Sequence, residues 1–162
     1  MARIASKLHP CLWFDGQALP AAEFYTGVFP DSSIDRITRF PSDATEGEPG
    51  AVLLVDFTLA GTRFVGLNGG SEFAFTEAVS FVITTEDQGE TDRYWSALTA
   101  GGEESMCGWL RDRYGLSWQV TPRRLLDLVT SDDAEVARRA FQAMQPMRKI
   151  DIATIEAAVA GG

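Results

Sequence analysis

The order of predicted elements in residues 10–122 constrains the fold most strongly, because the same order occurs twice. In each half a short strand leads into a helix that carries two adjacent aromatic residues, and three strand candidates come after the helix. Pro10 precedes Tyr25 by 15 residues, and Ser80 precedes Trp95 by the same 15 residues. The repeat predicts an α+β fold of two strand–helix–three-strand modules.

Helix-breaking and helix-capping residues mark the limits of the predicted helices in these modules. Pro30 ends the first predicted helix, and Gly101-Gly102 ends the second. Asp87, with Glu90 three residues later, is an acidic variant of the capping box and predicts the start of the second helix. We expect one domain with a first module over about residues 5–68, a second over about 77–122 and a helical extension over about 123–160.

The sequence CGWLRDRYGLSWQVTP at 107–122 predicts a hairpin whose second strand has two different faces. Three polar residues alternate there with three apolar residues; the polar ones are Ser117, Gln119 and Thr121, and the apolar ones are Leu116, Trp118 and Val120. Alternation at period two predicts that the apolar set packs against helices. The polar face is either an ordinary solvated surface or one wall of a small-molecule site.

Composition and charge exclude several classes of function. The 162 residues carry a formal net charge of −9 with few clustered basic residues, which argues against nucleic-acid binding. No apolar run is long enough to predict a membrane span, so no membrane partner is expected. Residues 1–8 lack the apolar segment of a signal peptide, and the two cysteines have no disulfide or metal spacing. These features predict a cytoplasmic protein.

Several motifs together resemble one known family. They are PCLWFDG at 10–16, AEFYTGVFPDS at 22–32, LNGG at 67–70, CGWLRDRYGLSWQVTP at 107–122 and KIDIATIEAA at 149–158. The chain resembles the PhnB-like family, whose members are often labelled 3-demethylubiquinone-9 3-methyltransferase. This family belongs to the vicinal oxygen chelate superfamily, with glyoxalase I, bleomycin-resistance proteins and extradiol dioxygenases. The resemblance implies paired βαβββ modules, a site on the concave face of a curved sheet, and a homodimer.

Enzymes of this superfamily hold a divalent cation with side chains from the first strand of each module and from a late strand. Alignment on the aromatic pair of the first helix puts Pro10, Ser80 and Gln119 at those positions. Proline has no donor atom, a neutral serine hydroxyl is a poor ligand, and Gln119 alone cannot hold a catalytic ion. We therefore expect no metal and no other cofactor. The single histidine, His9, lies one residue away, and a one-residue shift turns a side chain to the opposite face.

The same alignment predicts which side chains face the ligand. It places Pro10, Leu12 and Phe14 on the concave face and turns Cys11 and Trp13 towards the helix. The full set of candidate ligand-binding residues is Pro10, Leu12, Phe14, Asn68, Phe73, Phe75, Ser80, Cys107, Trp109 and Gln119. An apolar pocket with a few polar anchors is typical of small-ligand sites, but the aromatic residues of a dimer interface give the same pattern. No catalytic residue is assigned.

These observations predict a small-molecule-binding protein of the glyoxalase/bleomycin-resistance type that lacks a catalytic metal. The ligand is an unknown small molecule. The alternative is an enzyme of the superfamily, namely a lyase, a dioxygenase or the methyltransferase of the family label. Asn68-Gly69-Gly70 is the only glycine-rich stretch worth testing for a nucleotide-type cofactor, and residues 71–75 after it do not resemble the start of a phosphate-binding helix. A purely structural dimer with a degenerate cleft is a third interpretation.

Overall fold

A computed structural model describes residues 6–161 of the chain, which divides into two compact units, Met1–Ala74 and Phe75–Gly162. Residues 1–5, which include the predicted start of the first module and most of the stretch 1–8, lie outside the described residues. Within residues 6–161, no helix has the length and apolar character needed to cross a membrane.

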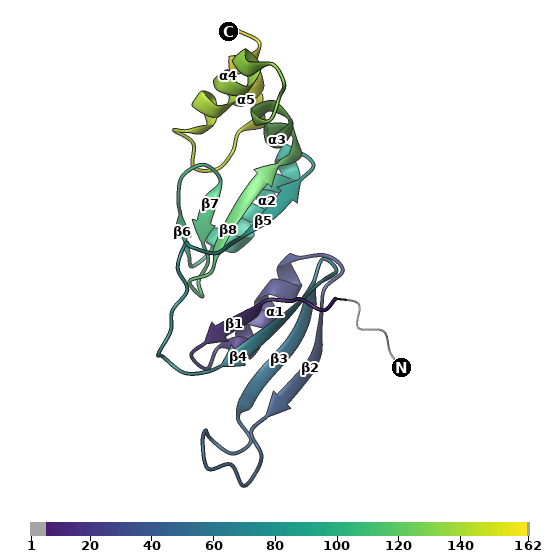
Figure 1. Cartoon of the computed structure of the whole chain (residues 1–162), viewed down its shortest axis with the longest axis vertical. Coiled ribbons are helices and arrows are strands. Elements are labelled where there is room, and N and C mark those ends of the chain that lie inside the picture. The colour runs from purple at the N-terminus through teal and green to yellow at the C-terminus, as the bar shows by residue number, and fades with distance from the viewer. Residues whose placement is uncertain (1–5, 162) are drawn as a thin grey trace. The chain divides into compact units, whose positions relative to one another are not determined.

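The first unit is a four-stranded sheet covered on one face by a helix (Figure 1). Its elements in chain order are β1 (Cys11–Phe14), α1 (Ala18–Val28), β2 (Ser33–Arg39), β3 (Val52–Leu59) and β4 (Thr62–Asn68). The strand order across the sheet is β1-β4-β3-β2, with β1 parallel to β4 and the other neighbours antiparallel. This is the strand–helix–three-strand order that the sequence predicts.

Aromatic rings form the centre of the first unit between α1 and the sheet. Tyr25 of α1 stacks on Phe57 of β3, with ring centroids 6.3 Å apart, and Phe57 stacks on Phe64 of β4 at 5.4 Å. Near the start of the helix, small residues let the backbones approach each other. A Cβ atom on Gly66 of β4 would lie 3.2 Å from the Cβ of Ala18, closer than most packed atoms.

The second unit repeats this arrangement and adds three helices. Its first elements are β5 (Ser80–Thr85), α2 (Gln88–Thr99), β6 (Glu103–Glu104), β7 (Trp109–Arg111) and β8 (Ser117–Pro122). The strand order is β5-β8-β7-β6, with β5 parallel to β8. The two sheets therefore share one topology, and the predicted pair of βαβββ modules is confirmed.

Buried polar contacts organise the core of the second unit. The Thr85 and Thr91 hydroxyl groups lie 2.6 Å apart between β5 and α2, and both residues are fully buried. Asp112 is also buried, and its carboxylate accepts hydrogen bonds from the indole of Trp118 at 2.8 Å and from the backbone of Tyr114 at 2.8 Å. Asp112 thereby fixes both the hairpin tip and the orientation of the Trp118 ring.

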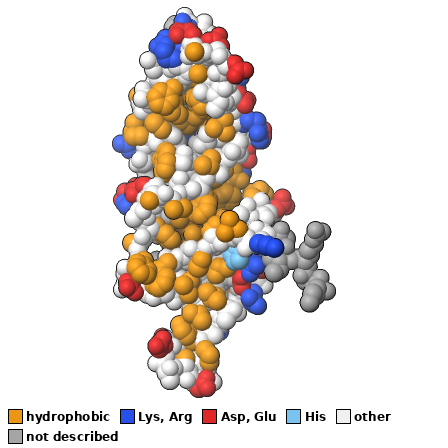
Figure 2. Space-filling model, viewed as in Figure 1, with side chains coloured by type: hydrophobic (Ala, Val, Ile, Leu, Met, Phe, Trp, Pro, Cys, Tyr) orange, Lys and Arg blue, Asp and Glu red, His pale blue; other side chains and the backbone are white. Residues whose placement is uncertain are grey.

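The C-terminal extension consists of α3 (Arg123–Val129), α4 (Ala134–Met144) and α5 (Ile152–Val159). It has a small core of its own, formed by Leu125, Leu128, Ala140, Ile150 and Ile155. The apolar face of α4 packs partly against this core, whereas Phe141 on the same helix is 50% exposed. Hydrophobic side chains also cover much of the viewed surface of each unit (Figure 2).

Candidate functional site

The open face of the second unit, meaning the face of its sheet opposite α2, brings three predicted site residues together. In the strand register Gln119 of β8 pairs with Trp109 of β7 and with Val82 of β5, and Ser80 of β5 pairs with Ser117. The Gln119 Nε2 atom donates a hydrogen bond to Ser80 Oγ at 2.9 Å. Trp118 and Val120 are buried on the opposite face, so the predicted alternation of this strand is confirmed.

This arrangement presents polar groups beside an aromatic ring. Ser80, Trp109 and Gln119 are each half-buried, which is the exposure expected of a wall that a ligand can reach. The Gln119 amide nitrogen donates to the Ser80 oxygen. The serine hydroxyl can therefore donate its hydrogen to another group, and the glutamine Oε1 can accept a hydrogen bond from another donor. Trp109 and Ser117 also line a hollow of about 150 Å³ at the edge of this face. That volume is below the usual range for small-molecule sites, and the lining of the hollow does not include Ser80 or Gln119.

The first unit has the opposite alternation from the one predicted. Leu12 and Phe14 are 5% and 3% exposed and lie on the α1 side of the sheet, where the Phe14 ring would be 3.5 Å from a Cβ on Gly66. Cys11 is exposed and pairs with Val65 on the open face, the face opposite α1. The expectation that Leu12 and Phe14 face the ligand, with Cys11 and Trp13 turned to the helix, is wrong.

Loop length explains this error. Residues 15–17 connect β1 to α1, whereas only residues 86 and 87 connect β5 to α2. Gly16, with φ 76°, occupies the extra length. Counting 15 residues back from the buried aromatic residue of each helix therefore reaches the open face at Ser80 but the helix face at Pro10.

The shift changes the position of the single histidine. The Pro10 carbonyl accepts a hydrogen bond from Val65 N at 3.0 Å, so the pairing of β1 with β4 continues to residue 10. Strand alternation then places His9 on the same face of the sheet as Cys11, opposite the face of Leu12. The Nδ1 atom of His9 is buried and has no hydrogen-bond partner among the described residues.

Two other predicted residues of the first unit have internal contacts. Asn68 Oδ1 accepts from Ala18 N at 2.9 Å, and its Nδ2 donates to the Val52 carbonyl at 3.0 Å. The side chain thereby ties the start of α1 to β3, which is a structural role. Phe73 is 59% exposed and meets the ring of Trp13 edge-on, with centroids 4.9 Å apart.

Trp13 explains the two glycines that come after Asn68. Its indole Nε1 donates to the Gly70 carbonyl at 2.8 Å, and Gly69 packs so closely on the ring that a Cβ atom has no room. The LNGG motif is therefore the end of β4 followed by two glycines that pack around a tryptophan, and nothing in its geometry requires a phosphate group.

An ion-pair cluster on the open face of the first unit was not predicted. Asp56 of β3 is buried, and its two carboxylate oxygens accept from Arg36 at 3.1 Å and from Arg63 at 2.8 Å. Burial opposes ionisation of Asp56, but the hydrogen bonds from Arg63 and Arg36 outweigh it and lower the pKa of the carboxyl group below its usual value. Strand pairing of residues 20 positions apart creates this contact, and composition gives no signal for it.

The first unit also contains a groove of about 830 Å³ at the end of its sheet, within the usual range for small-molecule sites. It is lined mainly by apolar residues of β1, β3, β4 and the start of α1, together with the loop between β2 and β3. These include Trp13, Leu19, Pro20, Phe40, Leu53, Leu67 and Asn68, while Glu46 and Glu48 are the charged residues of the lining. Trp13 and Asn68 thus border a hollow in this unit.

The remaining candidates lie in the second unit outside its strands. Phe75 is half-buried and precedes β5. Cys107 lies in the loop before β7 with φ 57°, and its Sγ is 3.6 Å from the Gln145 carbonyl oxygen. The Cys107 side chain therefore contacts the C-terminal extension, and a role for it in ligand binding stays a prediction.

The donors that this fold brings together do not suit a catalytic metal. On the open face of the second unit they are a neutral hydroxyl and a neutral amide, both weak ligands for transition metals. Among residues 6–161 no three His, Cys, Asp or Glu side chains are grouped closely enough to hold an ion.

Comparison with known proteins identifies the family. The sequence profile of the 3-demethylubiquinone-9 3-methyltransferase family matches residues 6–121. The chain belongs to this family. The matched residues include both modules and end within β8, so α3, α4 and α5 lie outside the family match. The comparison with curated proteins gave no match.

Solved structures agree with the family and with its fold. A PhnB protein from Bacillus cereus is 34% identical, with a TM-score of 0.66 over 72% of this chain and 99% of that one. A protein from Pseudomonas aeruginosa is 17% identical, with a TM-score of 0.57 over 73% and 98%. The fosfomycin resistance protein FosX from Mesorhizobium loti is 15% identical, with a TM-score of 0.50 over 72% and 90%, a likeness of fold alone. The predicted resemblance to the PhnB-like family is confirmed.

Proposed function

We propose that this member of the 3-demethylubiquinone-9 3-methyltransferase family binds a small organic molecule on the open face of its second unit, without a catalytic metal. The hydrogen-bonded pair of Ser80 and Gln119 beside Trp109 is the observation that carries the proposal. The pair offers one hydroxyl donor and one amide acceptor, and the indole offers an apolar surface. A ligand with a carbonyl or hydroxyl group next to a ring or short alkyl chain matches these groups.

Nuclear magnetic resonance can test this proposal without knowledge of the natural ligand. A library of small neutral carbonyl and hydroxyl compounds is screened against uniformly labelled protein. We expect some compounds to shift the side-chain amide signals of Gln119 and the indole signal of Trp109, and Gln119→Ala to weaken their binding about tenfold. Gln142→Ala on the exposed surface of α4 is the matched control and should leave binding unchanged. The absence of any shift at Gln119 and Trp109 across the library would overturn the proposal.

One observation favours the alternative of a metal-dependent enzyme. Alternation gives the single histidine the open face of the first unit, and its Nδ1 has no hydrogen-bond partner among residues 6–161. A first-strand histidine is the type of ligand that the superfamily resemblance implies. Elemental analysis of protein purified without chelators decides between the two functions. About one zinc, nickel, manganese or iron per chain, lost in His9→Ala, would contradict the metal-free proposal and support the enzyme alternative.

We also propose that the protein is a homodimer. The superfamily resemblance is the main support, and exposed Phe141 of α4 and Leu126 of α3 offer apolar surface for an interface. Most of the apolar face of α4 packs within the extension, so that helix supplies less free surface than its sequence suggests. Sedimentation should give twice the mass of one chain at micromolar concentration, and a monomer there would contradict the proposal.

A further inference from the structure

The C-terminal extension, which lies outside the family match, contacts the loop that leads into the proposed site. We name residues 147–151, which lie between α4 and α5, together with Ile152, the first residue of α5, the strap. We propose that the strap, held by Gln88 of α2, positions Trp109 on the open face of the second unit. The positioning role of the strap can hold whether or not a ligand binds, whereas its importance for binding rests on the function proposed above.

The first step is the contact between the strap and the loop before β7. The Met147 carbonyl accepts from Cys107 N at 2.7 Å, and the Arg148 carbonyl accepts from Gly108 N at 2.7 Å. Cys107 and Gly108 both have positive φ values, 57° and 81°. A non-glycine residue rarely adopts this conformation unless its surroundings hold it there. The two short hydrogen bonds that Cys107 N and Gly108 N donate to carbonyl groups of the strap provide that constraint.

The second step connects this loop to Trp109. The Gly108 carbonyl accepts from Val120 N at 2.8 Å, which extends the pairing of β7 with β8 by one residue. A Cβ atom on Gly108 would lie 2.7 Å from the Val120 carbonyl oxygen and 3.2 Å from the side chain of Ile150, so the loop fits tightly between β8 and the strap. Trp109 is the next residue, and its direction therefore depends on how residues 107 and 108 are held.

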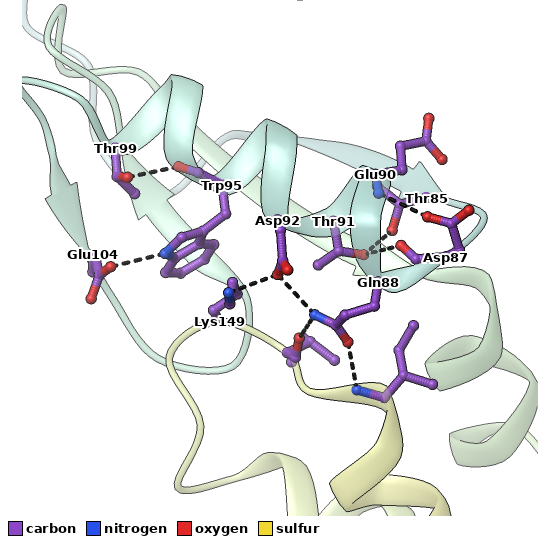
Figure 3. A network of polar contacts seen from close by, with 12 residues as sticks. Thr85, Asp87, Gln88, Glu90, Thr91, Asp92, Trp95, Thr99, Glu104 and Lys149 are labelled. Atoms are coloured by element: carbon purple, nitrogen blue, oxygen red, sulfur yellow. Dashed lines mark hydrogen bonds and ion pairs between the residues drawn. The ribbon is translucent and has the colours of Figure 1, made fainter.

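Gln88 fixes the strap from the other side (Figure 3). Its Nε2 donates to the Ile150 carbonyl at 3.0 Å and to Asp92 Oδ1 at 3.0 Å, and its Oε1 accepts from Ile152 N at 2.9 Å. One side chain thus bonds the carbonyl of Ile150 and the amide of Ile152, the backbone groups on either side of Asp151, and Ile150 itself is fully buried. Lys149 adds an ion pair with Asp92 at 2.7 Å.

These contacts form a chain from α2 through the strap to the proposed site. A helical extension that only stabilised the second unit would need no contact with the loop before β7. Here the backbone of the strap bonds the two residues that precede Trp109, and a side chain of α2 bonds the strap. Gln88 is therefore a positioning residue that acts on Trp109 through the strap and the loop.

The accessibility of Cys107 measures whether the strap opens. The Cys11→Ser background leaves Cys107 as the only thiol, half-buried beside the Gln145 carbonyl. In native buffer, we expect Gln88→Ala to raise the rate of Cys107 modification by an aromatic disulfide reagent about tenfold, since three hydrogen bonds are lost. Lys149→Ala, which removes a more exposed contact, should raise it about threefold. The matched control Gln142→Ala should stay within about twofold.

The indole signal of Trp109 separates positioning from mere stabilisation. The signal is assigned by its loss in Trp109→Phe and should shift in Gln88→Ala. The indole of Trp13, bonded to Gly70 in the first unit, serves as the internal reference and should not move. If Gln88→Ala does not fold, Lys149→Ala provides the same two measurements with smaller changes.

Two results overturn the inference. Unchanged Cys107 reactivity in both variants means that neither side chain holds the strap. Faster modification with an unmoved Trp109 signal means that the strap is only structural. Neither measurement uses a ligand, so a failed fragment screen would count against the proposed function and leave the positioning role standing.

Discussion

The two modules have the same topology but differ where the first strand enters the helix, and this difference determines which side chains reach their open faces. The β5–α2 connection is one residue shorter than the β1–α1 connection. As a result, Ser80 lies on the open face of its sheet, whereas the residue at the same count in β1, Pro10, has the parity of the buried Leu12. Equal spacing along the chain therefore does not give equal side-chain orientation when one connecting loop is a residue longer than the other.

The open faces also differ in chemistry. On the first unit, the buried carboxylate of Asp56 is paired with two arginines. On the second, a neutral amide is paired with a neutral hydroxyl. A charged cluster gives stability that depends on pH and salt, whereas a neutral pair leaves hydrogen-bonding groups for a ligand at any pH. The proposed binding face is the neutral one, although the larger of the two hollows lies in the first unit.

The largest expected effect tests the alternation of β8. Trp118→Ala removes a ring that is 3% exposed, contacts Phe81 and bonds Asp112, so it should lower the free energy of unfolding by about 3–5 kcal/mol. Gln119→Ala on the neighbouring open position should change it by less than about 0.5 kcal/mol. Denaturant unfolding curves of both variants measure this, and the reverse order of effects would show that the register of β8 is wrong.

A slightly smaller effect tests the opposite parity of β1. Phe14→Ala should cost about 3 kcal/mol, because the ring packs against α1 and Gly66. Cys11→Ala, on the exposed side, should change the unfolding free energy by less than about 0.5 kcal/mol. Thermal melting in reducing buffer ranks the two variants. A small loss of stability in Phe14→Ala together with a large loss in Cys11→Ala would show that β1 has the orientation predicted from the repeat.

The smallest effect distinguishes the two open faces by pH. The pKa of Asp56 is lowered from 3.8 in the folded protein, so its contribution is present above that value and is lost as the pH falls through the lower folded pKa. Asp56→Asn should therefore cost about 1–2 kcal/mol at neutral pH, since both arginines are partly exposed and screened by solvent.

That cost should shrink as the pH falls below about 3.8, where the carboxyl group binds a proton in the unfolded chain before it does so in the folded protein. Gln119→Ala, with no titrating group, should give the same small change at each pH. Unfolding curves at several pH values test the contrast. A pH-independent effect of Asp56→Asn would show that the two arginines do not stabilise the carboxylate.

The sequence by itself determined the repeated order of elements and the faces of β8. Six residues from Leu116 to Thr121 alternate strictly, and Asp87 with Glu90 marks the start of α2, where Glu90 N donates to Asp87 Oδ1 at 2.8 Å. Such signals are local, because strand alternation and helix capping depend on neighbours a few residues away. The family resemblance rests on the same kind of local motif.

Only the tertiary structure decided the orientation of β1 and the contacts that hold the site. A single loop residue reverses every side chain of a four-residue strand, and nothing in that short strand corrects the count. Asp56 meets Arg36 20 residues away, and Gln88 meets Ile150 62 residues away. A polar side chain can bond any backbone group of the chain, so its partner is fixed only when folding brings distant segments together.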